Sequence, residues 1–248
     1  MSLFLVATAC NKTVSPTPAP TPTPTNSALS KMEVEGNTVN ITYNSDGTVQ
    51  KLVSQPPANA AATTYVFSYE NGKLKEVNFG SKWKYTYNGE QLTKVETINP
   101  DGKIRYQNSF SYVNNRVDET IQYRVNDALG LTPMAKTKYQ YYTTGNVSKK
   151  EVFQYINNDW LKTEDISILE YDNKVNTSDR FENLPLVPNI IFAQNNPLRE
   201  KWLDAQGNID SNVEHQYVYD TNGRPLSRKT LYKYPGLPDF SSEIKYQY

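Results

Sequence analysis

One short sequence phrase recurs along the chain and constrains its fold more than any other feature. An aromatic pair brackets one residue, a turn with Gly follows, and an apolar residue comes next, as in Phe67-Ser68-Tyr69, Asn71-Gly72 and Leu74. Period-two alternation is typical of a strand, and Asn-Gly is typical of a tight hairpin turn. The other copies are Tyr85-Thr86-Tyr87 leading to Leu92, Tyr217-Val218-Tyr219 leading to Leu226, and weaker ones at Ile41-Thr42-Tyr43, Phe110-Ser111-Tyr112, Tyr139-Gln140-Tyr141, Leu169-Glu170-Tyr171 and Tyr246-Gln247-Tyr248.

The spacing of these copies predicts the fold class. Most closing tyrosines are 18 to 30 residues apart, which leaves room for one hairpin per copy. Eight copies predict an all-β, antiparallel meander of about 15–17 strands. A flat sheet of that width is disfavoured by strand twist, so we expect residues 30–248 to curl into a barrel or half-barrel. The alternation predicts that the rings gather on the inner surface.

One interval between copies is too long for a hairpin. Tyr171 and Tyr219 are 48 residues apart, and the segment 180–199 between them is apolar and shows no strand alternation. We expect a non-strand insertion there, with a helical turn at most, packed over one end of the sheet or into its curl. A plug that completes the core is the favoured interpretation, and a lid over a ligand is the alternative.

The N-terminus has the features of a targeting signal followed by a tether. Residues 1–9 form a short apolar run that ends in small residues, as the end of a signal peptide does. No Lys or Arg precedes the run, which is the pattern expected if the start of the signal peptide is truncated. Cys10 follows directly, which resembles the lipobox of bacterial lipoproteins and implies lipidation of Cys10. An ordinary signal fragment with an incidental Cys is the alternative. Residues 10–29 are rich in Pro and Thr and predict an extended tether.

Composition excludes some function classes. The chain has 26 basic and 26 acidic residues, so its formal net charge is zero and a nucleic-acid partner is not expected. Cys10 is the only cysteine, so no internal disulfide forms. The mean hydropathy is −0.70, and tyrosines run through the strands rather than forming girdles. That composition disfavours a lipid-facing barrel wall.

The search for chemistry finds no catalytic constellation. His215, the only histidine, lies on the aromatic face of an expected strand, and no motif supplies a second catalytic group. We therefore expect no catalytic residue, no metal site and no cofactor. The candidate ligand-contact aromatics are Trp83, Trp160 and Trp202, which could stack on sugar rings, although packing is the more common role of such residues.

Two resemblances extend this interpretation. Tyr219-Asp220-Thr221-Asn222-Gly223-Arg224 resembles the core of the YD repeat of Rhs-type proteins, which implies hairpin geometry. Almost the whole chain is similar to a Bacteroidetes lipoprotein family of unknown function, through the lipobox, the tether, Asn183-Leu184-Pro185-Leu186 and Asn195-Asn196-Pro197. This resemblance implies a porin-like β fold and supplies no catalytic residues.

Three functional hypotheses follow. The first is a non-enzymatic cell-envelope lipoprotein that binds a glycan or protein ligand through its β domain. It would be attached to the outer membrane through its lipid, with the periplasmic or surface face left open. The second is an integral outer-membrane β-barrel, and the third is a glycan-active enzyme.

Overall fold

The computed structural model describes residues 28–57, 60–126, 128–176, 181, 185–187 and 190–248. Cys10, the signal-like segment and most of the tether lie outside these residues. The described chain forms sixteen strands. They are β1 (Lys31–Val34), β2 (Asn37–Tyr43), β3 (Val49–Gln55), β4 (Thr63–Glu70), β5 (Lys73–Phe79), β6 (Ser81–Asn88), β7 (Gln91–Ile98), β8 (Ile104–Val113), β9 (Arg116–Asn126), β10 (Gly130–Tyr141), β11 (Val147–Ile156), β12 (Asp159–Val175), β13 (Asn195–Asp204), β14 (Ile209–Tyr219), β15 (Pro225–Lys233) and β16 (Phe240–Gln247).

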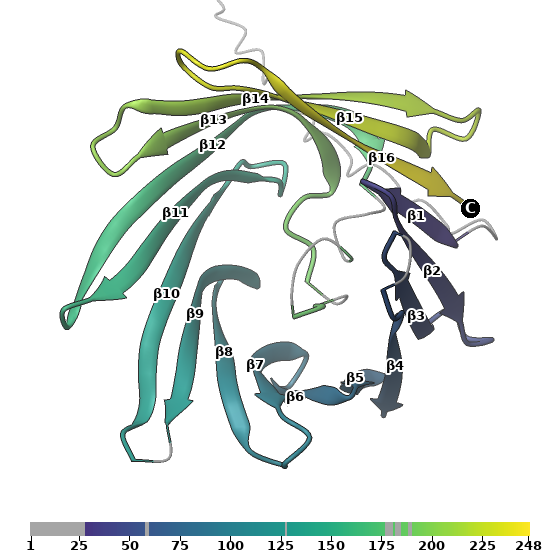
Figure 1. The fold of residues 1–248 in the computed structure, drawn as a ribbon, viewed down its shortest axis with the longest axis vertical. Helices are drawn as coiled ribbons and strands as arrows, with labels where there is room; N and C mark the ends of the chain where they lie inside the picture. Colours follow the sequence, from purple (N-terminus) through teal and green to yellow (C-terminus); the bar gives the residue numbers. More distant parts are fainter. Residues whose placement is uncertain (1–27, 58–59, 127, 177–180, 182–184, 188–189) are drawn as a thin grey trace, which may run out of the picture.

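The strands form one closed antiparallel barrel. Each strand pairs with its neighbours in the chain, and β1 pairs with β16, where Met32 lies opposite Tyr246 (Figure 1). The predicted antiparallel meander of 15–17 strands is confirmed, and it closes fully. Because the barrel is closed, none of the described strands is left as an edge with unpaired backbone N–H and C=O groups that could pair with another chain.

The repeated tyrosines lie at one end of the barrel. Each of the eight copies lies at or near the end of an even-numbered strand. Five of the closing tyrosines donate a hydroxyl hydrogen bond to a carbonyl near the start of the preceding odd-numbered strand, at 2.7–2.9 Å. The hydroxyl therefore ties each hairpin to the one before it. The pairs are Tyr43 to Leu29, Tyr69 to Val49, Tyr112 to Leu92, Tyr141 to Val117 and Tyr171 to Val147.

The residue directly opposite each closing tyrosine fills the inner face. Leu74 lies opposite Tyr69 and Leu92 opposite Tyr87, and both leucines are buried. Leu226, the apolar residue of the copy at Tyr219, does not take this inner position, because its side chain is 41% exposed. The longer turn after Tyr219 places Pro225 opposite it, so Pro225 is the buried residue and Leu226, one position on, points outward.

The predicted insertion lies inside the barrel. It spans residues 176–194, between the end of β12 and the start of β13, and its described part enters the lumen (Figure 1). Leu186, Val187, Ile190 and Phe192 are buried against the strands around them. The expected end at 199 is wrong, because Asn195-Asn196-Pro197 already begins β13 and pairs with the long end of β12.

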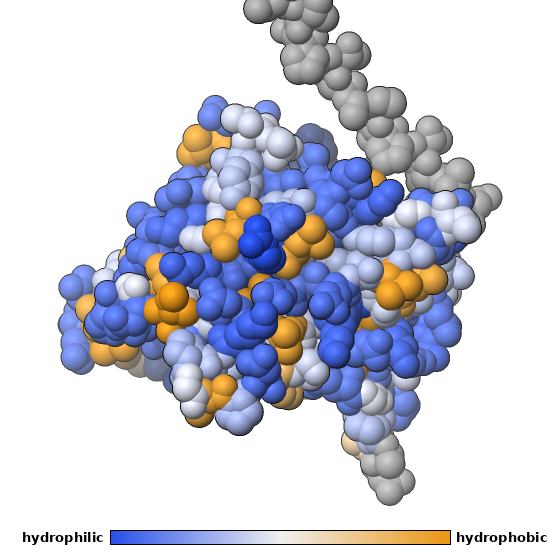
Figure 2. All heavy atoms as spheres, turned by 90° about the horizontal axis from the view of Figure 1, so that it is seen from above, coloured by the Kyte–Doolittle hydropathy of each residue, from blue (hydrophilic) through white to orange (hydrophobic). Residues whose placement is uncertain are grey.

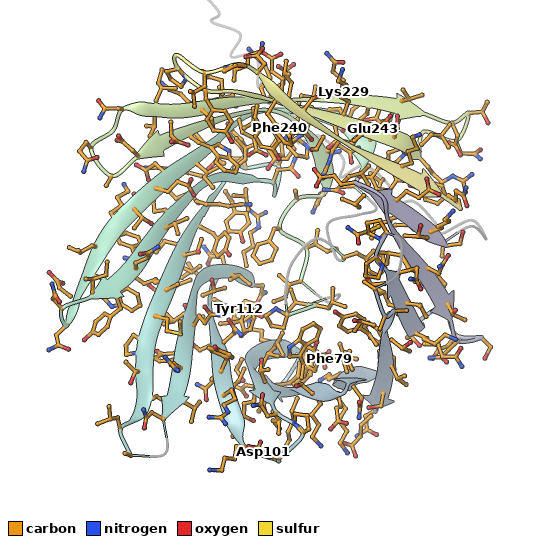
Figure 3. The ribbon with its side chains drawn as sticks, viewed as in Figure 1. Phe79, Asp101, Tyr112, Lys229, Phe240 and Glu243 are labelled. Atoms are coloured by element: carbon orange, nitrogen blue, oxygen red, sulfur yellow. The ribbon has the colours of Figure 1, made fainter. Side chains whose placement is uncertain are left out.

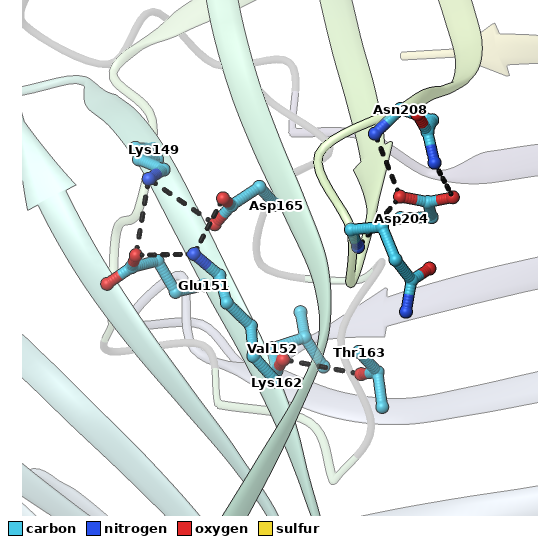
Figure 4. A network of polar contacts seen from close by, with 9 residues as sticks. Lys149, Glu151, Val152, Lys162, Thr163, Asp165, Asp204 and Asn208 are labelled. Carbon is cyan, nitrogen blue, oxygen red and sulfur yellow. Dashed lines mark hydrogen bonds and ion pairs between the residues drawn. The ribbon is translucent and has the colours of Figure 1, made fainter.

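The inner and outer faces differ in chemistry. Phe79 and Tyr112 point into the ring, whereas Asp101 lies at its outer margin (Figure 3). The outer wall is largely hydrophilic, with scattered apolar side chains (Figure 2). Salt bridges lie on this wall, including a cluster of Lys149, Glu151, Lys162 and Asp165 with N···O distances of 2.6–3.3 Å (Figure 4). No helix in the described part of the chain is long and apolar enough to cross a membrane.

Candidate functional site: an interior chamber

The three candidate tryptophans lie in three different environments. Trp83 on β6 is 7% exposed and packs against Tyr65 and Phe79, with ring centroids 5.7 and 4.6 Å away. It is part of the hydrophobic core and has no open face for a ligand.

Trp160 on β12 lies on the outer wall. It pairs with Tyr155 across the β11–β12 hairpin, and the Lys136 ammonium sits 4.4 Å from the Trp160 ring centroid and 4.9 Å from that of Phe153. These contacts hold the rings in a cation–π cluster on the surface.

Trp202 on β13 faces the interior. Its indole Nε1 donates a 2.8 Å hydrogen bond to the Glu200 carboxylate, and its ring makes an edge contact with Tyr232, with centroids 6.4 Å apart. Trp202 is the one of the three predicted tryptophans that lines the cavity beside the insertion.

That cavity is a chamber of about 270 Å³ between the insertion and the wall formed by β10–β15. Aromatic, apolar and charged side chains all face it. The lining residues are Tyr139, Val147, Lys150, Ile168, Tyr171, Asn176, Phe192, Ala193, Pro197, Glu200, Trp202, Val213, His215, Arg228, Thr230 and Tyr232.

A carboxylate, an imidazole and a hydroxyl form a chain of contacts at the chamber wall. His215 Nε2 lies 3.2 Å from Glu200 Oε1, and His215 Nδ1 lies 3.0 Å from Thr230 Oγ1. Because a carboxylate only accepts, Nε2 donates to Glu200, and in the neutral imidazole Nδ1 accepts from the Thr230 hydroxyl. Adjacent strands β13, β14 and β15 bring the three residues together.

The Glu200 carboxyl is held as an anion. Burial alone would raise its pKa, but the hydrogen bond and charge of His215, the Trp202 indole and the charge of Lys150 together bring that pKa below its ordinary value. Glu200 is thus a fixed negative charge inside the barrel.

Two cations also face the chamber. Lys150 lies on β11 opposite Tyr139 and Ile166, and Arg228 lies on β15 opposite Tyr217. Sequence reasoning missed both. Simple alternation from buried Val147 would turn Lys149 inward, but a bulge at Ser148 shifts the register and turns Lys150 inward instead.

The stem of the insertion is tied to the barrel by buried amides. Asn146 is 3% exposed, and its Oδ1 accepts from the backbone N–H groups of Gln194 and Asn195 at 2.7 and 3.1 Å. Its Nδ2 donates to the Asn195 side chain at 3.0 Å. A second tie joins Asp172, Asn196 and Tyr219, in which Asn196 donates twice to the Asp172 carboxylate. These contacts fix the insertion that forms one side of the chamber.

The carboxylate–imidazole–hydroxyl chain has the connectivity of a hydrolase triad, but its surroundings differ. Thr230 lies in mid-strand and pairs with His215 on one side and Ser242 on the other, so the backbone beside its hydroxyl belongs to the sheet ladders. An oxyanion site needs backbone or side-chain donors aimed at the reacting oxygen. No group of three or more His, Cys, Asp or Glu side chains in the described ranges is arranged to hold a metal ion.

A second hollow, of about 350 Å³, lies between β8 and β9 at the opposite end of the barrel from the tyrosines. Asn99, Arg105, Tyr106, Arg124 and Val125 line it. It is the more open of the two and holds no aromatic cluster, so the interior chamber is the better candidate for a ligand site.

Comparison with known proteins finds similarity in fold. No protein-family model and no curated protein matches the chain. A porin-like protein from Bacteroides uniformis ATCC 8492 is 14% identical with a TM-score of 0.65, over 88% of this chain and 96% of that one. A porin-like protein from Bacteroides vulgatus ATCC 8482 is 12% identical with a TM-score of 0.52, over 90% of this chain and 99% of that one. The expected porin-like β fold is thereby confirmed.

Proposed function

We propose that this chain is a non-enzymatic lipoprotein of the cell envelope whose barrel binds a ligand in the interior chamber. The observation that carries the proposal is the chamber itself, where an aromatic wall, two cations and a fixed anion surround about 270 Å³. A cavity lined by rings and a few placed polar groups is the usual form of a small-ligand site. The lipobox-like segment before Cys10 and the porin-like fold of the similar structures favour the envelope as its location.

The outer wall favours a barrel surrounded by water over one surrounded by lipid. Strand alternation places Lys82 and Glu76 outside, where they form a 3.2 Å salt bridge, and the Lys149, Glu151, Lys162 and Asp165 cluster lies on the same wall. A membrane barrel needs an outward apolar band about 25 Å tall. Charged pairs in mid-strand interrupt any such band.

The positions of the inner carboxylates argue against the glycan-active enzyme. Glu200 is held ionised, whereas burial, with a smaller effect of Asp210, raises the pKa of Glu164. Glu200 lies opposite Ile168, four residues along β12 from Glu164, which is a backbone separation of roughly 13 Å. The paired carboxyls of glycosidases lie about 5–10 Å apart.

A binding screen tests the proposal. The chain is screened against soluble glycans and short peptides in detergent-free buffer, beside an Ala193→Phe variant, whose added ring would occupy the chamber, and a Val218→Phe variant on the exposed outer wall as its control. We expect at least one ligand that binds the wild-type chain and Val218→Phe but not Ala193→Phe. Ligands that bind all three proteins equally, or a chain that is dispersed only in detergent, would contradict the proposal.

A further inference from the structure

The Lys150 ammonium is a charge inside the barrel that acts on its neighbours only at a distance. Within the described residues the Lys150 side chain makes no ion pair and no hydrogen bond, although its charge acts on Glu200 and Glu164. It lines the chamber, in register with Tyr139, whose ring packs on Phe192 of the insertion at 4.9 Å. A partly buried ammonium is costly to keep without a partner, so its position points to an anionic ligand.

Arg228 provides a second donor group facing the same space. It lies on β15, three strands beyond β12, so Lys150 and Arg228 reach the chamber from different parts of the wall. The planar guanidinium matches a carboxylate through two parallel hydrogen bonds, and an ammonium adds a compact charge. Both cations suit the same small oxyanion.

The net charge of the chamber favours a ligand with a single negative charge. With His215 counted as the neutral imidazole, the lining side chains of Lys150 and Arg228 contribute two positive charges and the Glu200 carboxylate contributes one negative charge. A monoanion therefore brings the lining to neutrality, whereas a dianion such as a phosphate monoester leaves an uncompensated charge inside the barrel.

The rings and the size favour a sugar. Trp202 and Tyr232 meet edge to face at 84°, so they present two differently oriented ring surfaces at the chamber wall. Aromatic faces pack well against the C–H surfaces of a saturated ring. The volume of about 270 Å³ lies just below the ~300–1,000 Å³ typical of ligand pockets, which fits one small ring rather than a long chain.

We propose that the chamber binds a uronic acid, a monosaccharide ring bearing one carboxylate. Lys150 and Arg228 hold the carboxylate, Trp202 and Tyr232 pack against the ring, and the Glu200 carboxylate, oriented by His215, accepts hydrogen bonds from its hydroxyls. This assignment rests on the proposed function and deepens it, because it names the class of ligand for the same site.

Isothermal titration calorimetry of the full-length chain tests it with four probes. Glucuronate and galacturonate carry one carboxylate, glucose is the neutral match, and glucose 6-phosphate is the dianion. We expect one of the two uronates to bind at least about tenfold more tightly than glucose and than glucose 6-phosphate. Equal binding of glucose would overturn the role of charge, and tighter binding of glucose 6-phosphate would overturn the carboxylate assignment.

Substitutions locate the binding. Lys150→Met keeps the length of the side chain and removes its charge, so uronate affinity should fall at least about tenfold. Lys229→Met on the exposed outer face of β15 is the matched control and should leave affinity unchanged. Arg228→Met should lower uronate affinity independently of Lys150→Met. Thermal unfolding of each variant verifies that it folds. Undiminished uronate binding in both Lys150→Met and Arg228→Met would overturn the site.

The outcomes separate this inference from the proposed function. Failure of both uronates to bind, with another screened ligand binding the wild-type chain but not Ala193→Phe, would overturn the uronate assignment and leave the ligand-binding function standing. Failure of every screened ligand would overturn both.

Discussion

The Tyr85 hydroxyl on β6 donates a 2.6 Å hydrogen bond across the barrel interior to the carbonyl oxygen of Leu186 in the insertion. Tyr85 is 6% exposed, and burial strongly raises the pKa of its phenol. The contact joins two residues that are 101 positions apart in the chain. The described part of the insertion is therefore held from the wall opposite its own stem as well as by the stem, and it packs inside the lumen.

Replacing Tyr85 by Phe should weaken this attachment. The Leu186 carbonyl would lose its donor inside a buried region, and we expect the free energy of unfolding to fall by about 1–2 kcal/mol. Urea denaturation followed by circular dichroism measures the change. Tyr106→Phe is the control, since Tyr106 is 39% exposed, and it should change stability by less than about 0.5 kcal/mol. An equal effect of the two variants would contradict the role assigned to the Tyr85 hydroxyl.

Replacing Asn146 by Ala should release the stem of the insertion. The backbone N–H groups of Gln194 and Asn195 would lose their acceptor in a buried site, at a cost of about 2–3 kcal/mol. Hydrogen exchange should show lower protection of those two amides than in the wild-type chain. Asn40→Ala is the matched control, since Asn40 is an exposed residue of β2, and it should leave both stability and exchange unchanged.

Glu200 should contribute to stability above its titration range and lose that contribution in acid. Its pKa is lower in the folded chain than its ordinary value near 4.5, so the folded state binds fewer protons and gains stability above that pH. As the pH falls through the lowered pKa, this stability is lost. Glu200→Gln should flatten the acid limb of a stability–pH curve relative to wild type. Curves that stay parallel below pH 4.5 would show that Glu200 is not held as an anion.

The tyrosine hydroxyls at the barrel end should make the fold sensitive to alkali. Burial is the main cause that raises the pKa of Tyr69 and of Tyr112 to about 12 from an ordinary value of 10. A raised pKa stabilises the fold fully below pH 10, and this contribution is lost as the pH rises from 10 to about 12. Ultraviolet titration should find these two phenols ionising late, with Tyr69→Phe and Tyr112→Phe removing late-ionising groups. Phenols that all ionise near pH 10 in a folded chain would contradict the burial of the Tyr69 and Tyr112 hydroxyls.

Much of the fold could be predicted from sequence because strand periodicity is local. The aromatic alternation around Tyr69 and Tyr87 fixes which side chains face inward, and the Gly-bearing turns fix where each hairpin reverses. Leu226 departs from the pattern of the other copies because one extra turn residue places Pro225 opposite Tyr219. The lipid anchor at Cys10 and the likeness to YD repeats stay predictions.

The chamber could not be predicted, because it depends on distant strands and on an irregular ladder. Glu200, His215 and Thr230 meet only once β13, β14 and β15 pair in register. Lys150 faces inward only because of a bulge that no residue type in that segment signals. The sequence marked Trp202 as a candidate for its aromatic ring alone, and gave no sign of which cations would join it.

The most direct test of ligand binding in the chamber is the NMR signal of the His215 imidazole, because His215 is the only histidine of the chain and lines the chamber. Its ring ¹H–¹⁵N signals are therefore a single reporter of that cavity. Titration of the chain with a bound ligand, glucuronate first, should shift these signals saturably, with the same affinity that calorimetry measures. Ligand binding that saturates in the calorimeter while the His215 signals stay unchanged would place the site elsewhere and contradict the account.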